Sequence, residues 1–227
     1  MRRTMTYKSL NKLRYRLFGG LIPEGKFGVK LMGHRLYVGG KWKQIGQLQF
    51  DFIVQQGGLQ PSDCFLDVGC GALRGGKHFI QYLDKDNYLG IDQEIELVKR
   101  GIEKELGVEF IIEKRPEFVI SNTFEFNKFN KIPQISLALS LFTHLIPDDI
   151  EVCLSNLRSF VDEGHMFFAT FFEGDSSKNQ SESHSLDHFE YSRNELMLIG
   201  EKHSWKSHYV GSWNHPRDQM MMRYTAV

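Results

Sequence analysis

Three segments of the chain place apolar residues on one face at a helical period, each with start or stop signals at its ends. Two glycines follow the first segment, a proline and two acids open the second, and a Ser-x-x-Glu capping box opens the third. The three predicted helices cover residues 44–56, 147–161 and 192–202.

Short apolar runs lie between these helices and are typical of buried strands. A helix over 77–83 and another from 95 to 107 separate the first three of them. The predicted strands are 64–68, 87–92, 117–122, 135–139, 165–171, 205–213 and 219–225. Strands that alternate with helices predict an α/β fold, a doubly wound and mostly parallel sheet with helices on both faces.

The run over 64–76, Cys-Phe-Leu-Asp-Val-Gly-Cys-Gly-Ala-Leu-Arg-Gly-Gly, joins a strand to a helix through a glycine turn. Gly69 and Gly71 allow a tight turn whose backbone N–H groups approach a ligand closely. Asp67, two residues before the first glycine, stands at the strand tip facing that ligand. A carboxylate there repels a pyrophosphate and suits an ammonium or sulfonium group, so the turn favours a cationic nucleoside over an anionic dinucleotide.

A second acid ends the next strand. Asp92 follows the apolar run over 88–91 and precedes the helical pattern that begins at Ile95. An acid at this position, beside the glycine turn, accepts hydrogen bonds from both hydroxyls of a ribose. The alternative is a plain helix N-cap, a role that aspartate commonly fills. Asp92 therefore indicates a ligand that contains a ribose, but it does not identify the cofactor.

These residues resemble the first motif of the class I S-adenosylmethionine (SAM)-dependent methyltransferases, Asp/Glu-x-Gly-x-Gly-x-Gly. Asp67, Gly69 and Gly71 match it, and Leu73 stands at the position of the third glycine. The resemblance implies SAM as cofactor, S-adenosylhomocysteine (SAH) as product, and a single domain over 44–227 with a seven-stranded sheet whose last strand is antiparallel. Ligands of open α/β sheets bind beyond the carboxyl ends of the strands. The expected cofactor-binding residues are Asp67, Gly69, Cys70, Gly71, Arg74, Asp92, Gln93, Asn122, Phe124 and Ser140.

The same rule selects candidates for the chemistry. His144, just past the strand over 135–139, is the candidate general base, and Glu173 and His215 are further catalytic candidates. The alternatives are a backbone-bonded histidine at a helix entry, a solvated loop carboxylate, and a turn stabilised by proline and an Arg–Asp pair. The residues expected to contact the substrate are Trp42, Trp213 and Arg217.

Residues 173–187 are polar and serine-rich, and predict a long loop that acts as a lid. His184, Asp187 and His188 invite a metal interpretation, because histidines at i and i+4 share a helix face. The segment shows no helical pattern and no further ligand is fixed nearby, so no metal site is expected.

The length of 227 residues and the hydrophobic content of 41% fit one domain with a sizeable core. No apolar run approaches the roughly 18 residues that a membrane helix needs, and no signal-peptide pattern is present. The three cysteines show no Cys-x-x-Cys spacing. They fit reduced thiols, and we expect a cytoplasmic protein.

The formal net charge of zero hides an asymmetry. Residues 1–43 carry 11 Lys and Arg against a single acid, Glu24, so the rest of the chain is acidic. Leucines at helical spacing over 10–17 predict a short basic amphipathic helix. This N-terminal arm either packs its leucines on the domain or binds a phosphorylated, nucleic-acid or membrane-associated substrate, and charge alone does not separate these partners.

The leading hypothesis is a methyltransferase acting on an O or N atom of a small-molecule or sugar-like acceptor, with an anionic acceptor as one option. The run over 140–143, Ser-Leu-Phe-Thr, stands where amino- and adenine-methylating enzymes carry Asn/Asp-Pro-Pro-Tyr/Phe, which disfavours a nucleic-acid base. The alternative is a non-catalytic SAM-binding or RNA-binding module that uses the basic arm. An NAD-dependent oxidoreductase is disfavoured because the turn lacks the third glycine of Gly-x-Gly-x-x-Gly.

Overall fold

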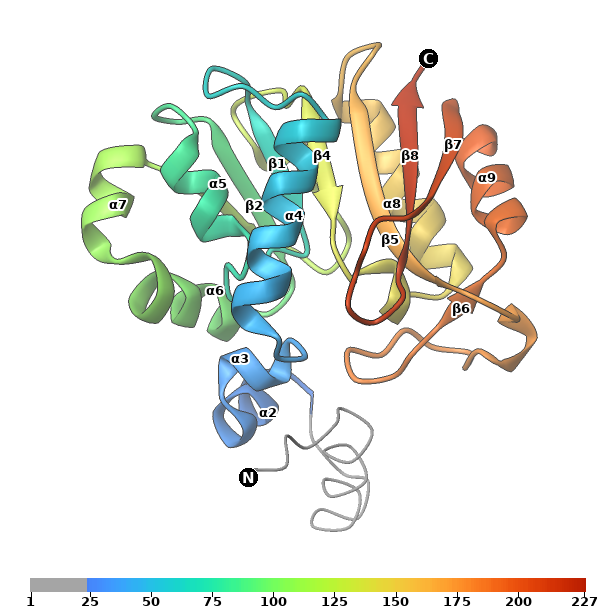
Figure 1. The fold of residues 1–227 in the computed structure, drawn as a ribbon, viewed down its shortest axis with the longest axis horizontal. Coiled ribbons are helices and arrows are strands. Elements are labelled where there is room, and N and C mark those ends of the chain that lie inside the picture. Colours follow the sequence, from blue (N-terminus) through green and yellow to red (C-terminus); the bar gives the residue numbers. More distant parts are fainter. Residues whose placement is uncertain (1–23) are drawn as a thin grey trace.

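A computed structural model describes residues 24–227, and the amphipathic helix expected over 10–17 lies outside this part of the chain. The described chain forms one twisted sheet with the strand order β3-β2-β1-β4-β5-β8-β7, and the short β6 pairs with β5 beside this path (Figure 1). The strands are β1 Phe65–Val68, β2 Tyr88–Asp92, β3 Glu117–Ile120, β4 Ile135–Ala138, β5 Met166–Glu173, β6 Glu190–Tyr191, β7 Trp205–Ser212 and β8 Met220–Ala226.

Strands β1 to β5 pair in parallel, and β8 alone among the seven main strands runs antiparallel to both of its neighbours. Because β7 is antiparallel to β8, it points the same way as β1 to β5. The predicted fold class, a doubly wound sheet with an antiparallel last strand, is confirmed. Its carboxyl edge is built from the ends of β1 to β5 and β7.

Helices cover both faces of the sheet, and two separate core clusters fill the space beneath them. The helices are α2 Gly25–Met32, α3 His34–Tyr37, α4 Trp42–Gln56, α5 Gly76–Tyr82, α6 Ile95–Gly101, α7 Val108–Lys114, α8 Pro147–Phe160 and α9 Arg193–Lys202. On one face α4, α5 and α6 bury residues such as Ile53, Phe79 and Val98. On the other face α8 and α9 bury residues such as Leu154 and Leu196.

One helix was missing from the prediction. The helical segment from Ile95 ends at Gly107 as expected, after a π-helical turn at Ile102–Leu106, but a separate helix, α7, follows it. Gly107 has φ 98°, which marks the break between the two helices. The exposed side chains of Val108 and Ile112 explain why α7 shows no clear hydrophobic period.

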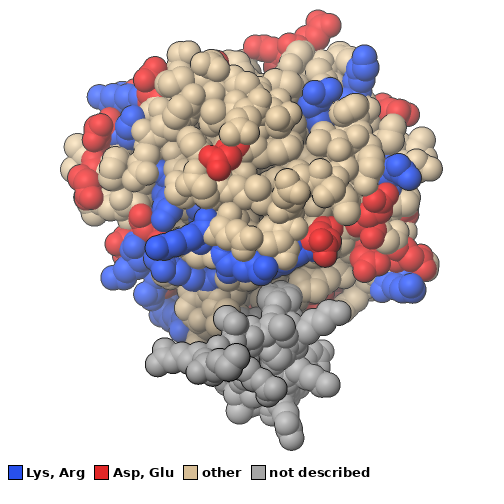
Figure 2. All heavy atoms as spheres, in the orientation of Figure 1, with Lys and Arg blue, Asp and Glu red and all other residues tan. Residues whose placement is uncertain are grey.

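Residues 24–43, which belong to the expected N-terminal arm, are largely helical and pack on the sheet domain. Val29, Tyr37 and Trp42 form a small core with two residues of the domain, Ala72 and Leu97. Helices α2 and α3 thereby lie at the carboxyl edge of the sheet, below β1 and β2 in the view of Figure 1. Figure 2 shows Lys and Arg side chains gathered along this lower edge of the molecule.

No helix within residues 24–227 is long and apolar enough to cross a membrane. Cys64, Cys70 and Cys153 are all buried and free. The expectation that the cysteines are unpaired is therefore confirmed.

Candidate functional site

A cavity of about 990 Å³ opens at the carboxyl edge of the sheet. Its walls come from the loops that follow β1 to β4, from α2 and α3, from residues 183–188, and from the turn between β7 and β8. Of the sixteen residues that the sequence marked as site candidates, twelve line this cavity: Asp67, Gly69, Cys70, Gly71, Arg74, Asp92, Gln93, Asn122, Phe124, Ser140, His144 and Arg217.

The glycine turn after β1 is hydrogen-bonded to the end of β2. The backbone N–H groups of Gly69 and Cys70 donate to the carbonyl oxygen of Ile91 at 2.8 and 3.0 Å. Gly71 donates its N–H to Oδ2 of Asp92 at 2.8 Å. Gly69 and Gly71 have φ values of 74° and 52°, a conformation that glycine adopts without steric cost. These hydrogen bonds therefore join the glycine turn and Asp92 in one structural unit.

Leu73, at the third glycine position of the motif, also has a positive φ, 61°. Its side chain is fully buried in the core under α5 and α6. The Leu73 side chain has room because its neighbours at positions 76 and 101 are glycines. A Cβ at Gly101 would lie 2.7 Å from Leu73 Cγ, and a Cβ at Gly76 would lie 2.9 Å from Leu73 Cδ2. The loop thus keeps the backbone path of a glycine while a leucine fills the space beneath it.

Asp67 is buried at the end of β1 and accepts a hydrogen bond from the hydroxyl of Tyr88 at 2.8 Å. Burial and the nearby Asp92 raise the pKa of Asp67 to about 7, against the opposing effects of the Tyr88 hydroxyl and the Arg74 charge. No Lys or Arg of residues 24–227 forms an ion pair with Asp67. A positive charge placed in the cavity would stabilise this carboxylate.

Asp92 ends β2 with each carboxylate oxygen holding one backbone N–H, from Gly71 to Oδ2 and from Glu94 to Oδ1, both at 2.8 Å. Burial raises the pKa of Asp92 to about 6 against these two hydrogen bonds. The N-cap of α6 is Glu94, whose carboxylate accepts from the N–H of Glu96. The alternative of Asp92 as a plain helix N-cap is therefore wrong.

Two residues beyond β3 and β4 take unusual backbone conformations where they line the cavity. Phe124 has φ 55° and Ser140 has φ 57°. Ser140 is held there by its N–H, which donates to Oγ1 of Thr170 at 2.6 Å. Non-glycine residues at positive φ cluster at functional sites, where the surrounding fold imposes the conformation.

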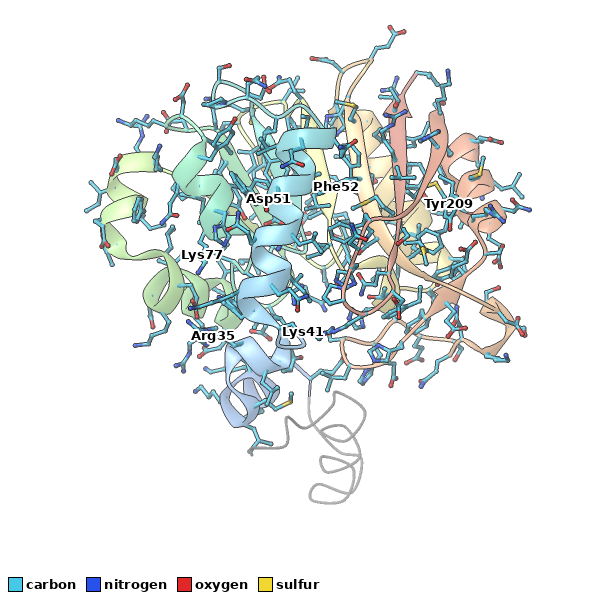
Figure 3. The ribbon with its side chains drawn as sticks, in the orientation of Figure 1. Arg35, Lys41, Asp51, Phe52, Lys77 and Tyr209 are labelled. Carbon is cyan, nitrogen blue, oxygen red and sulfur yellow. The ribbon has the colours of Figure 1, made fainter. Side chains whose placement is uncertain are left out.

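Arg74 and Arg217 bring positive charge to the cavity. Arg74 is buried, donates to the carbonyl oxygen of Val38 at 2.9 Å, and has its pKa lowered to about 9 by burial and by Arg217. Arg217, in the turn between β7 and β8, donates to the carbonyl oxygen of Gly39. Lys41 holds the same turn through a hydrogen bond to the carbonyl oxygen of Pro216 at 3.1 Å, and Figure 3 shows it at the start of α4 near this turn.

His144 lies in a 3₁₀ turn, Phe142–His144, between β4 and α8. Its Nδ1 is 2.7 Å from the carbonyl oxygen of Asp187, which can only accept, so Nδ1 carries the proton. No donor of the described chain reaches Nε2, and His144 lines the cavity. Burial, with the charges of His188 and Arg217, lowers the pKa of His144 to about 4, against hydrogen bonds to the backbone of Asp187 and His184. The imidazole is therefore neutral at pH 7, with one nitrogen able to take a proton.

Residues 183–188 line the cavity at the end of the loop that the sequence predicts to act as a lid, and this segment is called the lid below. The N–H of His184 donates to the carbonyl oxygen of His144 at 3.0 Å. On the far side, the N–H of Ser185 donates to the carboxylate of Glu24, and Leu186 packs on the small core of α2 and α3. His184 lies 3.5 Å from both Glu24 and Asp187, and the described residues contain no group of side chains that could hold a metal ion.

Four expected site residues lie outside the cavity lining. Glu173, at the end of β5, accepts from the hydroxyl of Tyr209 at 2.6 Å, and Figure 3 shows Tyr209 on the side of the molecule away from Lys41. Trp42 is buried between α3 and α4, where it meets the ring of His34 edge-on.

The other two of these residues stack on each other. The rings of Trp213 and His215 are 5.1 Å apart and nearly parallel, and both side chains are buried. Burial, together with the charges of Arg74, Arg217 and Lys41, lowers the pKa of His215 to about 3. A residue so placed supports the turn between β7 and β8 rather than reaching the cavity.

Sequence reasoning missed Gln219, Tyr37 and His188, which all line the cavity. Gln219 directly precedes β8, one residue beyond the turn that the carboxyl-edge rule had selected. Its signal was a polar residue before an apolar run of methionines. Tyr37 carries no such signal, because only the packing of α3 on the domain brings it to the site.

The strand order, the glycine turn and the two acids at the ends of β1 and β2 are those of the class I SAM-dependent methyltransferases. This is the fold of the present chain. No family model matches the sequence.

Solved structures of several methyltransferases share this fold. Magnesium protoporphyrin IX methyltransferase from Synechocystis PCC 6803, with bound SAM, has 12% sequence identity and a TM-score of 0.61, and the alignment covers 100% of both chains. An O-methyltransferase family protein from Burkholderia thailandensis has 7% identity and a TM-score of 0.66, covering 97% of this chain and 70% of that one. The pyocyanin biosynthetic protein PhzM has 14% identity and a TM-score of 0.65, covering 97% of this chain and 67% of that one.

Proposed function

We propose that this protein is a SAM-dependent methyltransferase that transfers a methyl group to an O or N atom of a small-molecule or sugar-like acceptor and releases SAH. The observation that carries the proposal is the pair Asp67 and Asp92. They lie at the carboxyl ends of adjacent parallel strands, joined through a glycine turn, and both line a cavity of about 990 Å³. That volume is within the range of small-molecule and cofactor sites.

The residues around the two acids fit this cofactor. Each oxygen of Asp92 accepts one backbone N–H, which leaves a further lone pair on each for the two hydroxyls of a ribose. Asp67 is a buried carboxylate without a basic ion-pair partner in the described chain, so it suits the α-ammonium of the methionine moiety. Phe124 and Asn122, beyond β3, lie on the side of Asp92 where the base would extend.

SAM supplies a methyl group that is already activated on a sulfonium, so the protein needs to align the acceptor and exclude water. Residues 183–188 line the cavity and are bonded to Glu24, so this segment is placed to exclude water once ligands are bound. A hydroxyl or ammonium acceptor must also lose a proton. His144 is placed to take it on Nε2, because the carbonyl oxygen of Asp187 holds the proton on Nδ1 and orients the ring.

A small acceptor is supported by the enclosed shape of the site. The lid contacts both α8 and the start of α2. Ser183 donates to Asp149, and the N–H of Ser185 donates to Glu24, so residues of the same chain close this side of the cavity. Among the solved structures of this fold is also a glycopeptide N-methyltransferase with a TM-score of 0.62 and 9% identity. A cytoplasmic location is part of the proposal and fits the three free thiols.

The test is a calorimetric titration of the full chain with SAH, SAM and NAD. We expect SAH and SAM to bind at one site and to raise the melting temperature, since a ligand that binds only the folded state stabilises it. NAD should give no shift, because Asp67 repels a pyrophosphate. Binding of NAD but not of SAH would overturn the proposal, and strong salt-dependent RNA binding without SAH binding would favour the RNA-binding alternative.

A further inference from the structure

We propose that the acceptor carries an anionic oxygen group, a carboxylate or a phosphate, and that Gln219 and Arg217 bind it at the end of the cavity away from Asp67 and Asp92. This inference rests on the proposed function and names the chemical class of its acceptor. The strand order supports the separation, because β8, which Gln219 precedes, is four strands from β2, which Asp92 ends. Four strand spacings are roughly 19 Å.

The side chain of Gln219 is fixed by its own oxygen. Oε1 accepts from Oγ of Ser140 at 3.0 Å and from Oγ1 of Thr170 at 2.9 Å. Oγ1 of Thr170 in turn accepts from the N–H of Ser140, so its hydroxyl hydrogen is directed to Gln219. This network sets which end of the amide is oxygen, and it turns the NH₂ group away from both hydroxyls.

The NH₂ group of Gln219 has no acceptor among the described residues. Both hydrogen bonds of the side chain go to its oxygen, and no acceptor within residues 24–227 takes a hydrogen bond from Nε2. Gln219 is only 2% exposed, yet it lines the cavity. The NH₂ group is therefore available to an acceptor atom of a molecule bound in the cavity.

Arg217 adds positive charge two residues away in the same turn. Its guanidinium packs against the backbone of Gly39 so closely that a Cβ there would lie 2.5 Å from a guanidinium nitrogen. The turn itself is closed by a hydrogen bond from the N–H of Asp218 to the carbonyl oxygen of His215 at 2.9 Å. Residue 39 and the turn therefore hold Arg217 at the cavity wall.

The charge of Arg217 reaches the groups around it. It contributes to lowering the pKa of Arg74, His144 and His215, after burial in each case. Of the acids near this side of the cavity, Asp149 accepts from Ser183 and Asp187 lies 3.5 Å from His184. Arg217 and the neighbouring Arg74 bring positive charge to this end of the cavity.

The chemistry of the two side chains specifies the ligand. An amide NH₂ and a guanidinium are donors, and neither of these groups can accept. Donors beside a positive charge select oxygen atoms that carry negative charge, which form the stronger, charge-assisted hydrogen bonds. The lone pair on Nε2 of His144 is left for the proton of the reacting hydroxyl or amine.

The test uses the full chain saturated with SAH, so that the cofactor end is filled, and titrates it with inorganic phosphate or with acetate at constant ionic strength. We expect phosphate, acetate or both to bind, and the stronger of the two indicates which anion the acceptor carries. Gln219→Leu and Arg217→Gln should each weaken that binding at least tenfold and leave SAH affinity within twofold. Arg193→Gln, a surface arginine outside the cavity lining, should change neither.

Each negative result has its own meaning. If neither anion binds above a chloride control, or if both variants bind as well as the native chain, the anion site is wrong while the SAM proposal stands. If the native chain does not bind SAH, the proposed function fails, and the same anion titration without SAH still decides the anion site. Arg217→Gln keeps the test valid if Gln219→Leu does not fold, because the substitution lies in a surface turn.

Discussion

The N–H of Gly71 donates to the carboxylate of Asp92 at 2.8 Å, so the glycine turn after β1 and the acid at the end of β2 are one structural unit. The same carboxylate accepts from the N–H of Glu94 and so also fixes the start of α6. Asp92 thus positions the turn and, in the proposed function, binds the ribose. Loss of its carboxylate should affect cofactor binding through both roles.

Asp92→Ala is expected to weaken SAM binding at least tenfold, because hydrogen bonds to a charged group contribute about 1.5–3 kcal/mol. Isothermal titration of a folded variant measures it. The control is Glu163→Ala, an exposed carboxylate between α8 and β5 at the opposite edge of the sheet. Unchanged affinity in folded Asp92→Ala would exclude the ribose role.

Cofactor binding should also depend on pH through Asp67. Its pKa of about 7 in the unliganded protein exceeds the ordinary carboxyl value because of burial and Asp92, with Tyr88 and Arg74 opposing. A cationic ligand favours the ionised carboxylate and lowers this pKa, so binding below about pH 7 releases a proton. The affinity for SAH should therefore rise from about pH 5 to pH 7 and level off above.

The sign for stability is the opposite of the usual carboxylate case. A raised pKa means that the folded state binds more protons than the unfolded state between about pH 4 and pH 7, so the unliganded protein should lose stability as pH rises through that window. Asp67→Asn should reduce both dependences. Thermal melts and titrations from pH 5 to pH 8 measure them, and pH-independent SAH affinity in the native chain would contradict this account.

Leu73→Gly should destabilise the protein even though the residue stands at a glycine position of the motif. The change relieves a positive φ, worth about 1–2 kcal/mol, but removes a fully buried side chain, which costs about 2–5 kcal/mol. Denaturant unfolding of Leu73→Gly checks the balance, and an increase in stability would show that strain dominates.

Gly101→Ala tests the same packing from the other side. The new Cβ would lie 2.7 Å from the backbone of Ala72 and from Leu73, so we expect a loss of about 1–3 kcal/mol together with weaker SAH binding. Lys99→Ala, on the exposed face of the same helix, is the matched control and should be near neutral.

The sequence predicts the helices and strands well wherever one face of a segment is buried. Helix α7 was not predicted, because its apolar residues Val108 and Ile112 are exposed and give no hydrophobic period. Asp67 and Asp92 could be found because sequence order alone places the ends of β1 and β2 together. Glu173 could not be placed in the same way, since it is the last residue of a long strand whose alternation turns it toward Tyr209. Gln219 depends on a network from three segments distant in the chain, which no local pattern reveals.

The role of His144 is open to a direct test. If His144 takes the proton of the acceptor, His144→Ala should lower turnover roughly 100-fold or more and leave SAM affinity little changed. Because the pKa of His144 is lowered to about 4 by burial, the native enzyme should keep its rate down to about pH 5 and lose it only as Nε2 becomes protonated near pH 4. His144→Gln, which can still donate toward the carbonyl oxygen of Asp187, separates positioning from proton transfer.

A purely structural histidine would give a different pattern. His144 also ties the lid to the loop after β4, through its carbonyl oxygen and the N–H of His184, a contact that either substitution keeps. If the side chain only supports the lid, His144→Ala should lower the melting temperature, His144→Gln should restore it, and both should keep most of their turnover with acceptor and SAM at saturation. Low turnover in both variants, with a normal melting temperature in His144→Gln, is the outcome expected for proton transfer, because the glutamine keeps a donor toward Asp187 but has no basic nitrogen.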